Sequence, residues 1–211
     1  NFIIECIPDP SIAMIKARLT KYIVQDEVEY IFYDYIFTSP SLITEFASAD
    51  VKEYVALMML SNTLKEVAMN YKVFIQSATQ LNDGRSKKEI GLRDQNCLRG
   101  SKAIADKIDI GLIGVRLNEE ERKQIDAIWT ELKKQNPGKY RNEPNIVIDI
   151  YKNRRGELNC VKIFRYFDYG TCHCEDLFVT DPSYHAVNDI GDLKFEKHAY
   201  DFLDLKTRGI V

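Results

Sequence analysis

The stretch that most constrains the fold is Glu29-Tyr30-Ile31-Phe32-Tyr33-Asp34, an apolar run that ends in a single carboxylate. Small and polar residues, Thr38 and Ser39, and then Pro40 follow closely. A continuous apolar run bounded by turn signals predicts a buried strand of a parallel sheet. A carboxylate at the carboxyl end of such a strand lies where open α/β sheets bind ligands. Asp34 is therefore a candidate site residue, and the alternative is an aspartate that is solvated or caps a helix.

The composition is that of an ordinary globular protein. The 211 residues are 45% hydrophobic and 29% charged, with a net charge of −3, which predicts one α/β domain or one and a half. This charge gives no global signal for nucleic acid, so a basic surface would have to be local. We find no apolar run long enough to span a bilayer and no charged-then-apolar leader, and expect no membrane partner. The five cysteines have irregular spacing, which favours a reducing compartment and hence the cytoplasm.

The beginning of the chain predicts a βαβ unit that includes this strand. Phe2–Ile7 has the composition of a strand, and the turn Pro8–Ser11 ends in a candidate helix cap. Apolar residues then recur at helical spacing from Ile12 to Ile23, so a helix should connect the two strands. The chain has no initiator Met and enters a strand-like run directly, and we therefore expect it to be the middle of a longer polypeptide.

A further strand and a long basic segment follow a helix that we expect between Asp50 and Tyr71. Val73–Ile75 is a short apolar run that leads to Gln80, so it predicts a strand whose end carries a polar amide. Residues 81–98 show no hydrophobic periodicity, and a loop of this length in a compact domain is usually functional or disordered. The segment up to residue 99 is locally basic, and the alternative to a binding role is a solvated surface run.

The second half of the chain predicts mixed elements that end in an antiparallel meander. The expected elements are a helix at 101–107, a strand at 108–115, a helix from Asn118, strands at 145–151 and 158–167 around the hairpin turn 153–156, and a strand at 172–179. Cys172-His173-Cys174 invites a metal, but no other ligands with normal spacing accompany it, so a half-buried strand is the preferred interpretation.

Four features fall in a fixed order: a strand ending at Asp34, a strand leading to Gln80, a basic loop, and a hairpin with Lys152 and Arg154. This order resembles the motor domain of hexameric replicative DNA helicases of the DnaB type and their phage relatives. The likeness covers roughly residues 2–180. Its motifs are Ile31–Tyr35 for the Walker B strand, Thr79–Asn82 for the Ser-Gln-Leu-Asn motif, Leu98–Ile104 for the helix after the DNA-binding loop, Lys152–Gly156 for the Lys-x-Arg hairpin, and Ile7–Ile12 for the segment leading to Walker B.

The resemblance implies an α/β fold, namely a RecA-like P-loop NTPase core with a mostly parallel central sheet flanked by helices and a C-terminal antiparallel hairpin or meander. Residues 1–180 would be a partial motor domain, and 181–211 an extension of unknown role. The P-loop pattern G-x-x-x-x-G-K-[ST] does not occur in the sequence. We therefore expect the chain to be the part of a motor that follows the P-loop half, and to be inactive as an ATP hydrolase by itself.

The resemblance also implies a site for ATP and Mg²⁺ in the parent protein. Asp34 would bind Mg²⁺, since a hard cation prefers oxygen ligands. Gln80 would sense the γ-phosphate or the attacking water. Arg154, helped by Lys152, would act as an arginine finger on the nucleotide of a neighbouring subunit. Arg155 is the alternative if the hairpin register is shifted by one residue.

The basic loop would grip the backbone of single-stranded DNA in a ring channel, through cationic side chains and backbone N–H groups. The candidate DNA contacts are Arg85, Lys87, Lys88, Arg93 and Arg99. Other copies of the chain in a hexameric ring, and a primase or helicase loader, would be the protein partners.

Two other interpretations stay open. The chain could come from a degenerate RecA-like protein that binds DNA or partners without unwinding, which a P-loop upstream in the parent gene would exclude. It could also be an α/β module of unrelated function. The latter predicts that Asp34 and Gln80 lie on non-adjacent strands.

Overall fold

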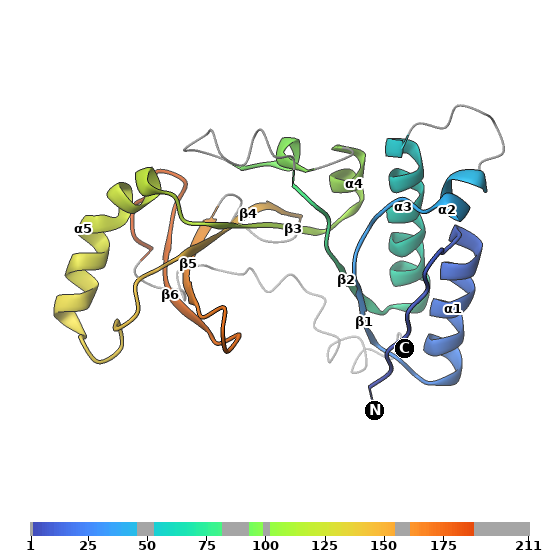
Figure 1. Ribbon diagram of the computed structural model, residues 1–211, viewed down its shortest axis with the longest axis horizontal. Helices are drawn as coiled ribbons and strands as arrows, with labels where there is room; N and C mark the ends of the chain where they lie inside the picture. The colour runs from blue at the N-terminus through green and yellow to red at the C-terminus, as the bar shows by residue number, and fades with distance from the viewer. Residues whose placement is uncertain (1, 46–52, 82–92, 99–101, 155–160, 188–211) are drawn as a thin grey trace, which may run out of the picture. The chain divides into compact units, whose positions relative to one another are not determined.

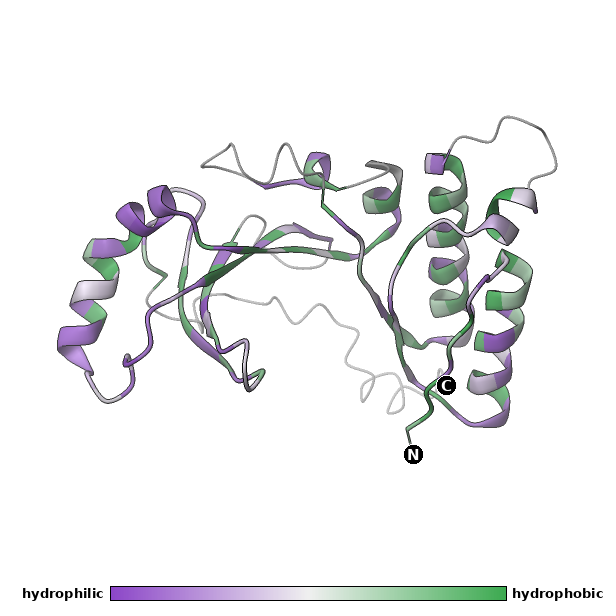
Figure 2. Cartoon of the chain, in the orientation of Figure 1, coloured by the Kyte–Doolittle hydropathy of each residue, from purple (hydrophilic) through white to green (hydrophobic). Residues whose placement is uncertain are grey.

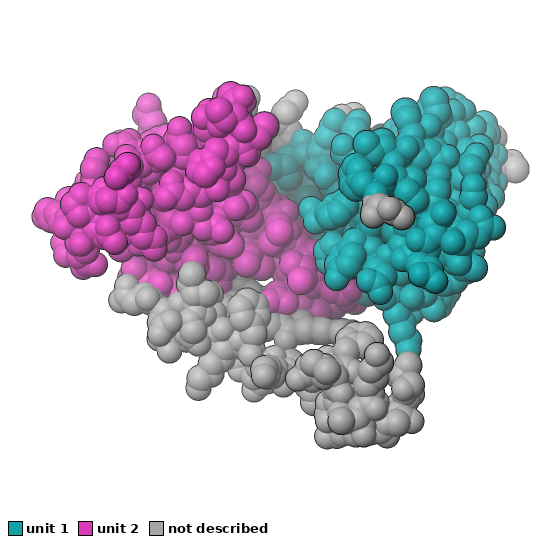
Figure 3. Space-filling model, turned by 90° about the horizontal axis from the view of Figure 1, so that it is seen from below, with its two compact units in different colours: residues 1–82, 95–108 teal, residues 83–94, 109–211 magenta. Residues whose placement is uncertain are grey.

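The structure is a computed structural model that describes residues 2–45, 53–81, 93–98, 102–154 and 161–187. The chain forms two compact units, of which the first contains residues 1–82 and 95–108 and the second residues 83–94 and 109–211 (Figure 3). The elements in chain order are α1 (Ile12–Gln25), β1 (Tyr30–Tyr33), α2 (Pro40–Thr44), α3 (Glu53–Tyr71), β2 (Phe74–Ser77), the 3-10 helix η1 (Gln95–Cys97), α4 (Lys102–Lys107), β3 (Ile110–Arg116), α5 (Glu119–Gln135), β4 (Ile146–Asn153), β5 (Val161–Phe167) and β6 (Cys174–Thr180) (Figure 1).

In the first unit, helices pack on one face of a two-stranded parallel sheet (Figure 1). α3 supplies most of the core and is predominantly hydrophobic along its length (Figure 2). The buried core residues are Ile15, Ile36, Leu42, Ala56, Leu57, Leu60, Leu64 and Ile104. The N-terminus of α1 is capped twice, because Ser11 Oγ accepts from the Met14 N–H and the Glu45 carboxylate accepts from the Ile12 N–H at 2.6 Å.

The other face of this sheet is apolar and exposed. Tyr33 and Ile75 pack against the helical core, whereas Tyr30, Phe32 and Phe74 on the opposite side are 68%, 66% and 51% exposed. Tyr30 and Phe74 are paired in register, with ring centroids 6.1 Å apart. Parallel sheets are usually covered on both faces. This aromatic face is therefore the most unusual surface of the first unit.

The second unit is a four-stranded antiparallel sheet in the order β3-β4-β5-β6, with α5 packed on one face. α5 is mainly hydrophilic (Figure 2), and it buries Glu121, Ile125 and Trp129. Ile125 packs with Val147 and Phe164, and the Phe164 ring stacks on Phe178 at a centroid distance of 4.8 Å. The sheet and α5 therefore form a core of their own.

This architecture overturns the expected RecA-like P-loop NTPase core with a mostly parallel central sheet. Among the strands that the structure describes, only β1 and β2 are parallel, and the strand at 110–116 does not join them. It pairs instead with β4, antiparallel, from Ile110–Asn153 to Arg116–Ile146. The expected strand at Phe2–Ile7 is also wrong, because this stretch makes no ladder and Phe2 and Ile4 are exposed.

The predicted helices that fall on described residues are confirmed, as is the antiparallel meander at the end of the chain. In the described parts of the chain, no helix combines the length and the apolar character needed to cross a membrane.

Candidate functional site

The carboxyl ends of β1 and β2 lie side by side, because the two strands are parallel neighbours. Tyr33 pairs with Ser77, whose hydroxyl donates a hydrogen bond of 2.7 Å to the Tyr33 carbonyl. The pairing continues beyond the strands, since the Ile36 N–H donates to the Ala78 carbonyl at 2.9 Å. Asp34 thus lies between Tyr33 and Ile36, whose backbone groups are both hydrogen-bonded to the segment that contains β2 and Ala78.

Asp34 and Gln80 follow these adjacent strands, and both residues are exposed. The Asp34–Tyr35 peptide bond is cis. Mg²⁺ at nucleotide sites is typically held by one or two carboxylates together with substrate phosphates. Within the described ranges, no group of three His, Cys, Asp or Glu residues could hold a metal ion. A Mg²⁺ ion held by the Asp34 carboxylate would have to take its other oxygen ligands from phosphates or water.

The basic segment begins and ends at one place in the first unit. Leu81 and Leu98 form an isolated antiparallel bridge that closes its base. Cys97 and Leu98 are buried, and the Leu98 N–H also donates to the Gln95 carbonyl at 3.3 Å. Four of the five expected DNA contacts, Arg85, Lys87, Lys88 and Arg99, lie outside the described residues.

The fifth expected DNA contact, Arg93, is only 4% exposed, so its charge does not reach a surface where a phosphate could bind. Its guanidinium forms a two-pronged bond to Glu121, with Nη1–Oε1 and Nη2–Oε2 distances of 2.8 and 2.7 Å. Nη1 also donates to Asp149 Oδ2 at 2.7 Å. The expectation that Arg93 contacts DNA was therefore wrong. The sequence around Arg93 shows its positive charge, but it does not show that Glu121 and Asp149 bind the guanidinium in a buried site.

Lys162 completes a buried cluster of four charges in the second unit. Its Nζ lies 2.6 Å from Asp149 Oδ1, 3.9 Å from Glu121 Oε1 and 5.2 Å from the ring centroid of Tyr184. Burial, followed by the charge of Glu121, raises the pKa of Tyr184 to about 12. Burial by itself lowers the pKa of Arg93, but its bonds to Glu121 and Asp149 outweigh this and raise it. The cluster thus contains two basic and two acidic side chains, whose formal charges balance.

We did not predict this cluster from the sequence, although a signal was present. Asp149 and Lys162 each lie between two apolar residues of a strand, at Ile148-Asp149-Ile150 and Val161-Lys162-Ile163. A charged residue inside such a run is almost never fully buried unless it is paired. Opposite charges on consecutive strands of a predicted hairpin were therefore candidates for a buried pair.

Lys152 and Arg154 lie at the end of β4, in the second unit. Lys152 pairs with Gly111, and the Arg154 N–H donates to the Asp109 carbonyl at 3.0 Å. The Arg154 side chain is exposed. Arg155, the alternative finger, lies outside the described residues.

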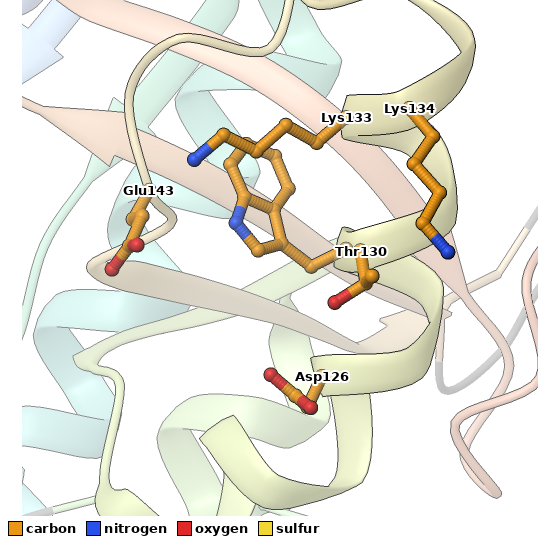
Figure 4. Close-up of a pocket in the computed structure, with 6 residues that line it drawn as sticks. Asp126, Thr130, Lys133, Lys134 and Glu143 are labelled. Carbon is orange, nitrogen blue, oxygen red and sulfur yellow. The ribbon is translucent and has the colours of Figure 1, made fainter.

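A groove along α5 is a separate concave feature of the second unit, with a cavity of ≈ 330 Å³. It is lined by Asp126, Trp129, Thr130, Lys133, Lys134 and Glu143. Lys133 extends toward Glu143, whereas Lys134 points away from it (Figure 4). Two acidic and two basic side chains line the groove, so its lining does not favour a ligand of either charge.

Comparison with known proteins identifies one relative of unassigned role. No protein-family profile matches the chain. The chain is 36% identical, over 188 residues, to the SPbeta prophage-derived uncharacterized protein YorI of Bacillus subtilis strain 168. The match covers 86% of this chain and 36% of the relative. The chain therefore spans little more than a third of the length of a prophage protein to which it is similar.

Proposed function

We propose that this chain is part of the motor of a DnaB-type replicative DNA helicase, which couples ATP hydrolysis to movement along single-stranded DNA. The observation that carries the proposal is the parallel pairing of β1 with β2, since it brings Asp34 and the segment leading to Gln80 to one sheet edge. The alternative of an unrelated α/β module predicts instead that Asp34 and Gln80 follow non-adjacent strands. The prophage origin of the relative agrees with the phage branch of that helicase class.

The nucleotide chemistry in this proposal belongs to the parent polypeptide. ATP bound there would supply the phosphoryl group, with Mg²⁺ on its phosphates. Asp34 would hold the metal through one carboxylate, and Gln80 would orient water or sense the terminal phosphate by hydrogen bonding. Arg154, with Lys152 two residues before it, would place a fixed positive charge against a neighbour's nucleotide. The chain by itself has no P-loop, so we expect it to hydrolyse no ATP.

DNA would bind to the basic segment, through Arg85, Lys87, Lys88 and Arg99. Binding of this kind needs cations that reach phosphates and does not need base recognition. Arg93 is excluded from these contacts because its guanidinium is buried against Glu121 and Asp149. The bridge between Leu81 and Leu98 would present the segment from the same sheet edge as Asp34.

The test is binding of a dT oligonucleotide to the 211-residue chain across a range of salt concentrations. Lys87→Ala/Lys88→Ala should weaken binding and flatten the slope of log K against log salt by about 0.7 per lost phosphate contact. The matched control is Lys133→Ala/Lys134→Ala, an adjacent lysine pair on α5. Equal losses in both double variants would point to nonspecific attraction and would remove the DNA-binding role of the segment.

A second experiment separates the helicase from a DNA-binding module without unwinding activity. Strand separation by the parent protein, with ATP and a forked duplex, supports the helicase. DNA binding without nucleotide hydrolysis in the parent would instead support the module.

A further inference from the structure

The hairpin that joins β5 to β6 carries an exposed aromatic side chain in its turn. Tyr169 is 54% exposed. The guanidinium of Arg116 lies over the Tyr169 ring, 5.0 Å from its centroid, and the Phe167 ring makes an edge-to-face contact with it at a centroid distance of 5.1 Å. A cation and a second aromatic ring thus hold Tyr169 while much of the residue faces solvent.

The antiparallel sheet brings these side chains together from strands that are not neighbours. Arg116, the last residue of β3, pairs with Ile146 of β4, and Ile146 pairs with Arg165 of β5. Residues in register share a face of the sheet, as do residues two apart on one strand, so Arg116, Arg165 and Phe167 lie on one face. This face is opposite to α5, since Val147, the next residue of β4, packs in the core under that helix.

Hydrogen bonds hold the backbone on both sides of Tyr169. The Asn145 side chain donates to the Phe167 carbonyl and accepts from the Phe167 N–H, each at 2.8 Å. The Asp168 carboxylate accepts from the Gly170 N–H at 2.9 Å and from the Thr171 hydroxyl at 2.7 Å. A site that is ordered before its ligand arrives loses less conformational entropy on binding.

The charges of this face leave one arginine for an anion. Arg165 forms an ion pair with Asp176 across β5 and β6. Arg116 is exposed, and it makes no ion pair with any residue in the described ranges. The donors of a guanidinium lie in its plane, so its rim can bind an anion while its face covers the Tyr169 ring.

We propose that Tyr169 and Arg116 form a binding site for one nucleotide of single-stranded DNA, in which a base stacks on the exposed part of the Tyr169 ring and a phosphate binds the Arg116 guanidinium. The choice of ligand rests on the proposed function, which requires contacts with single-stranded DNA. Aromatic rings stack any base and cations contact the backbone, so a site of this kind tolerates every sequence. Arginine matches the geometry of a phosphate through its planar fork of donors.

The experiment compares two probes on the 211-residue chain, a dT oligonucleotide and an abasic oligonucleotide of the same length, which keeps the phosphates but lacks the bases. Tyr169→Leu removes the aromatic face, and Tyr169→Phe keeps it. Tyr54→Leu, at a tyrosine that is 46% exposed on α3, is the matched control. Arg116→Gln removes the cation, with Arg122→Gln on the exposed side of α5 as its control. Melting curves check that each variant folds.

We expect Tyr169→Leu to weaken dT binding about tenfold and to leave abasic binding nearly unchanged, because stacking needs a base. Tyr169→Phe and Tyr54→Leu should bind both probes like the wild type. Arg116→Gln should weaken both probes and flatten the slope of log K against log salt by about 0.7, because one phosphate contact is lost. Arg122→Gln should keep the wild-type slope.

Equal affinity of the wild type for the two probes, or no binding of either, would overturn the proposal. An equal loss in Tyr169→Leu and Tyr54→Leu would also overturn it. Oligo-U bound tenfold more tightly than dT would make RNA the ligand and refute the assignment to DNA. The proposed function is tested separately, since it fails if the parent protein separates no strands, whereas the nucleotide site depends only on the two probes and the variants of the 211-residue chain.

Discussion

Asp149 and Lys162 face each other across β4 and β5, joined by a hydrogen bond of 2.6 Å, and both are buried. Such a pair is not a strong source of stability, because removing two charges from water costs about as much as their attraction returns. The pair matters for stability in another way. Removing any one member of the cluster leaves a buried charge without its partner, which is strongly destabilising. Glu121 and Arg93 extend the pair to a balanced set of four.

The first prediction concerns the loss of one charge from this cluster. Lys162→Met should lower the free energy of unfolding by about 3–5 kcal/mol, because it leaves two buried carboxylates with Arg93 alone. The exposed Lys123→Met should change it by less than about 0.5 kcal/mol. Urea denaturation of both variants measures the difference. Equal free energies of unfolding for Lys162→Met and Lys123→Met would show that water reaches the cluster and screens its charges.

The second prediction is a fall in stability at alkaline pH. Burial raises the pKa of Tyr151 to about 12, from a usual value of 10.0. Between these two values the unfolded chain loses the phenolic proton while the folded chain keeps it, so stability present below pH 10 declines as the pH rises toward 12. Tyr151→Phe should show a smaller drop in the free energy of unfolding between about pH 9 and about pH 11. An identical drop would exclude Tyr151 as a cause.

The third prediction tests a close approach in β3. A Cβ added at Gly111 would clash with the outer end of the Tyr151 ring, whereas one at Gly114 would meet only Ile148 at 4.0 Å. Gly111→Ala should therefore force the Tyr151 ring aside and destabilise the protein by about 1–3 kcal/mol. Gly114→Ala is the control and should be tolerated. If Gly111→Ala/Tyr151→Val is no more stable than Gly111→Ala, the ring is not what excludes the methyl group.

Local features of the sequence predicted where helices and strands lie better than they predicted which strands pair with one another. The helix after Ser11 was foreseeable because an N-cap residue and an apolar stripe at helical spacing coincide there. β3 was foreseeable as a strand, but its pairing with β4 instead of the parallel strands depends on residues far along the chain. Phe2–Ile7 has strand composition and yet makes no ladder, because apolar content alone does not supply a neighbour.

The candidate site shows the same limit. Asp34 and Gln80 could be placed from strand ends, and the register of β1 with β2 agrees with that placement. The burial of Arg93 depends on Glu121 and Asp149, which lie 28 and 56 residues away. The apolar neighbours of Asp149 point to a partner such as Lys162, but nothing near either acid points to Arg93. Charge counts in a loop therefore predict its composition but not which cations reach solvent.

The fourth prediction follows from the exposed aromatic face of β1 and β2. Phe32 is 66% exposed beside two other aromatic residues, and contiguous apolar patches of this kind promote association. Phe32→Ser should reduce the binding of a hydrophobic dye and any concentration-dependent self-association, with little change in melting temperature. Met69→Ser, at 65% exposed on α3, is the matched control. A large loss of stability in Phe32→Ser would mean that this face is already covered.

The last prediction addresses hydrolysis in the parent protein. Gln80→Ala and Arg154→Ala should each reduce DNA-stimulated ATP hydrolysis, Arg154→Ala by about 10³-fold, because an arginine finger stabilises the charge that develops on the transferred phosphoryl group. If Arg154 acts on a neighbour's nucleotide, mixing Arg154→Ala subunits that can bind ATP with wild-type subunits should restore hydrolysis at the mutant subunits' own sites. Gln80→Ala subunits should gain nothing from such mixing, since Gln80 follows the strand next to Asp34 in the same chain. Rescue of both variants, or of neither, would contradict the assignment of Arg154 to the neighbour's nucleotide and of Gln80 to the nucleotide of its own subunit.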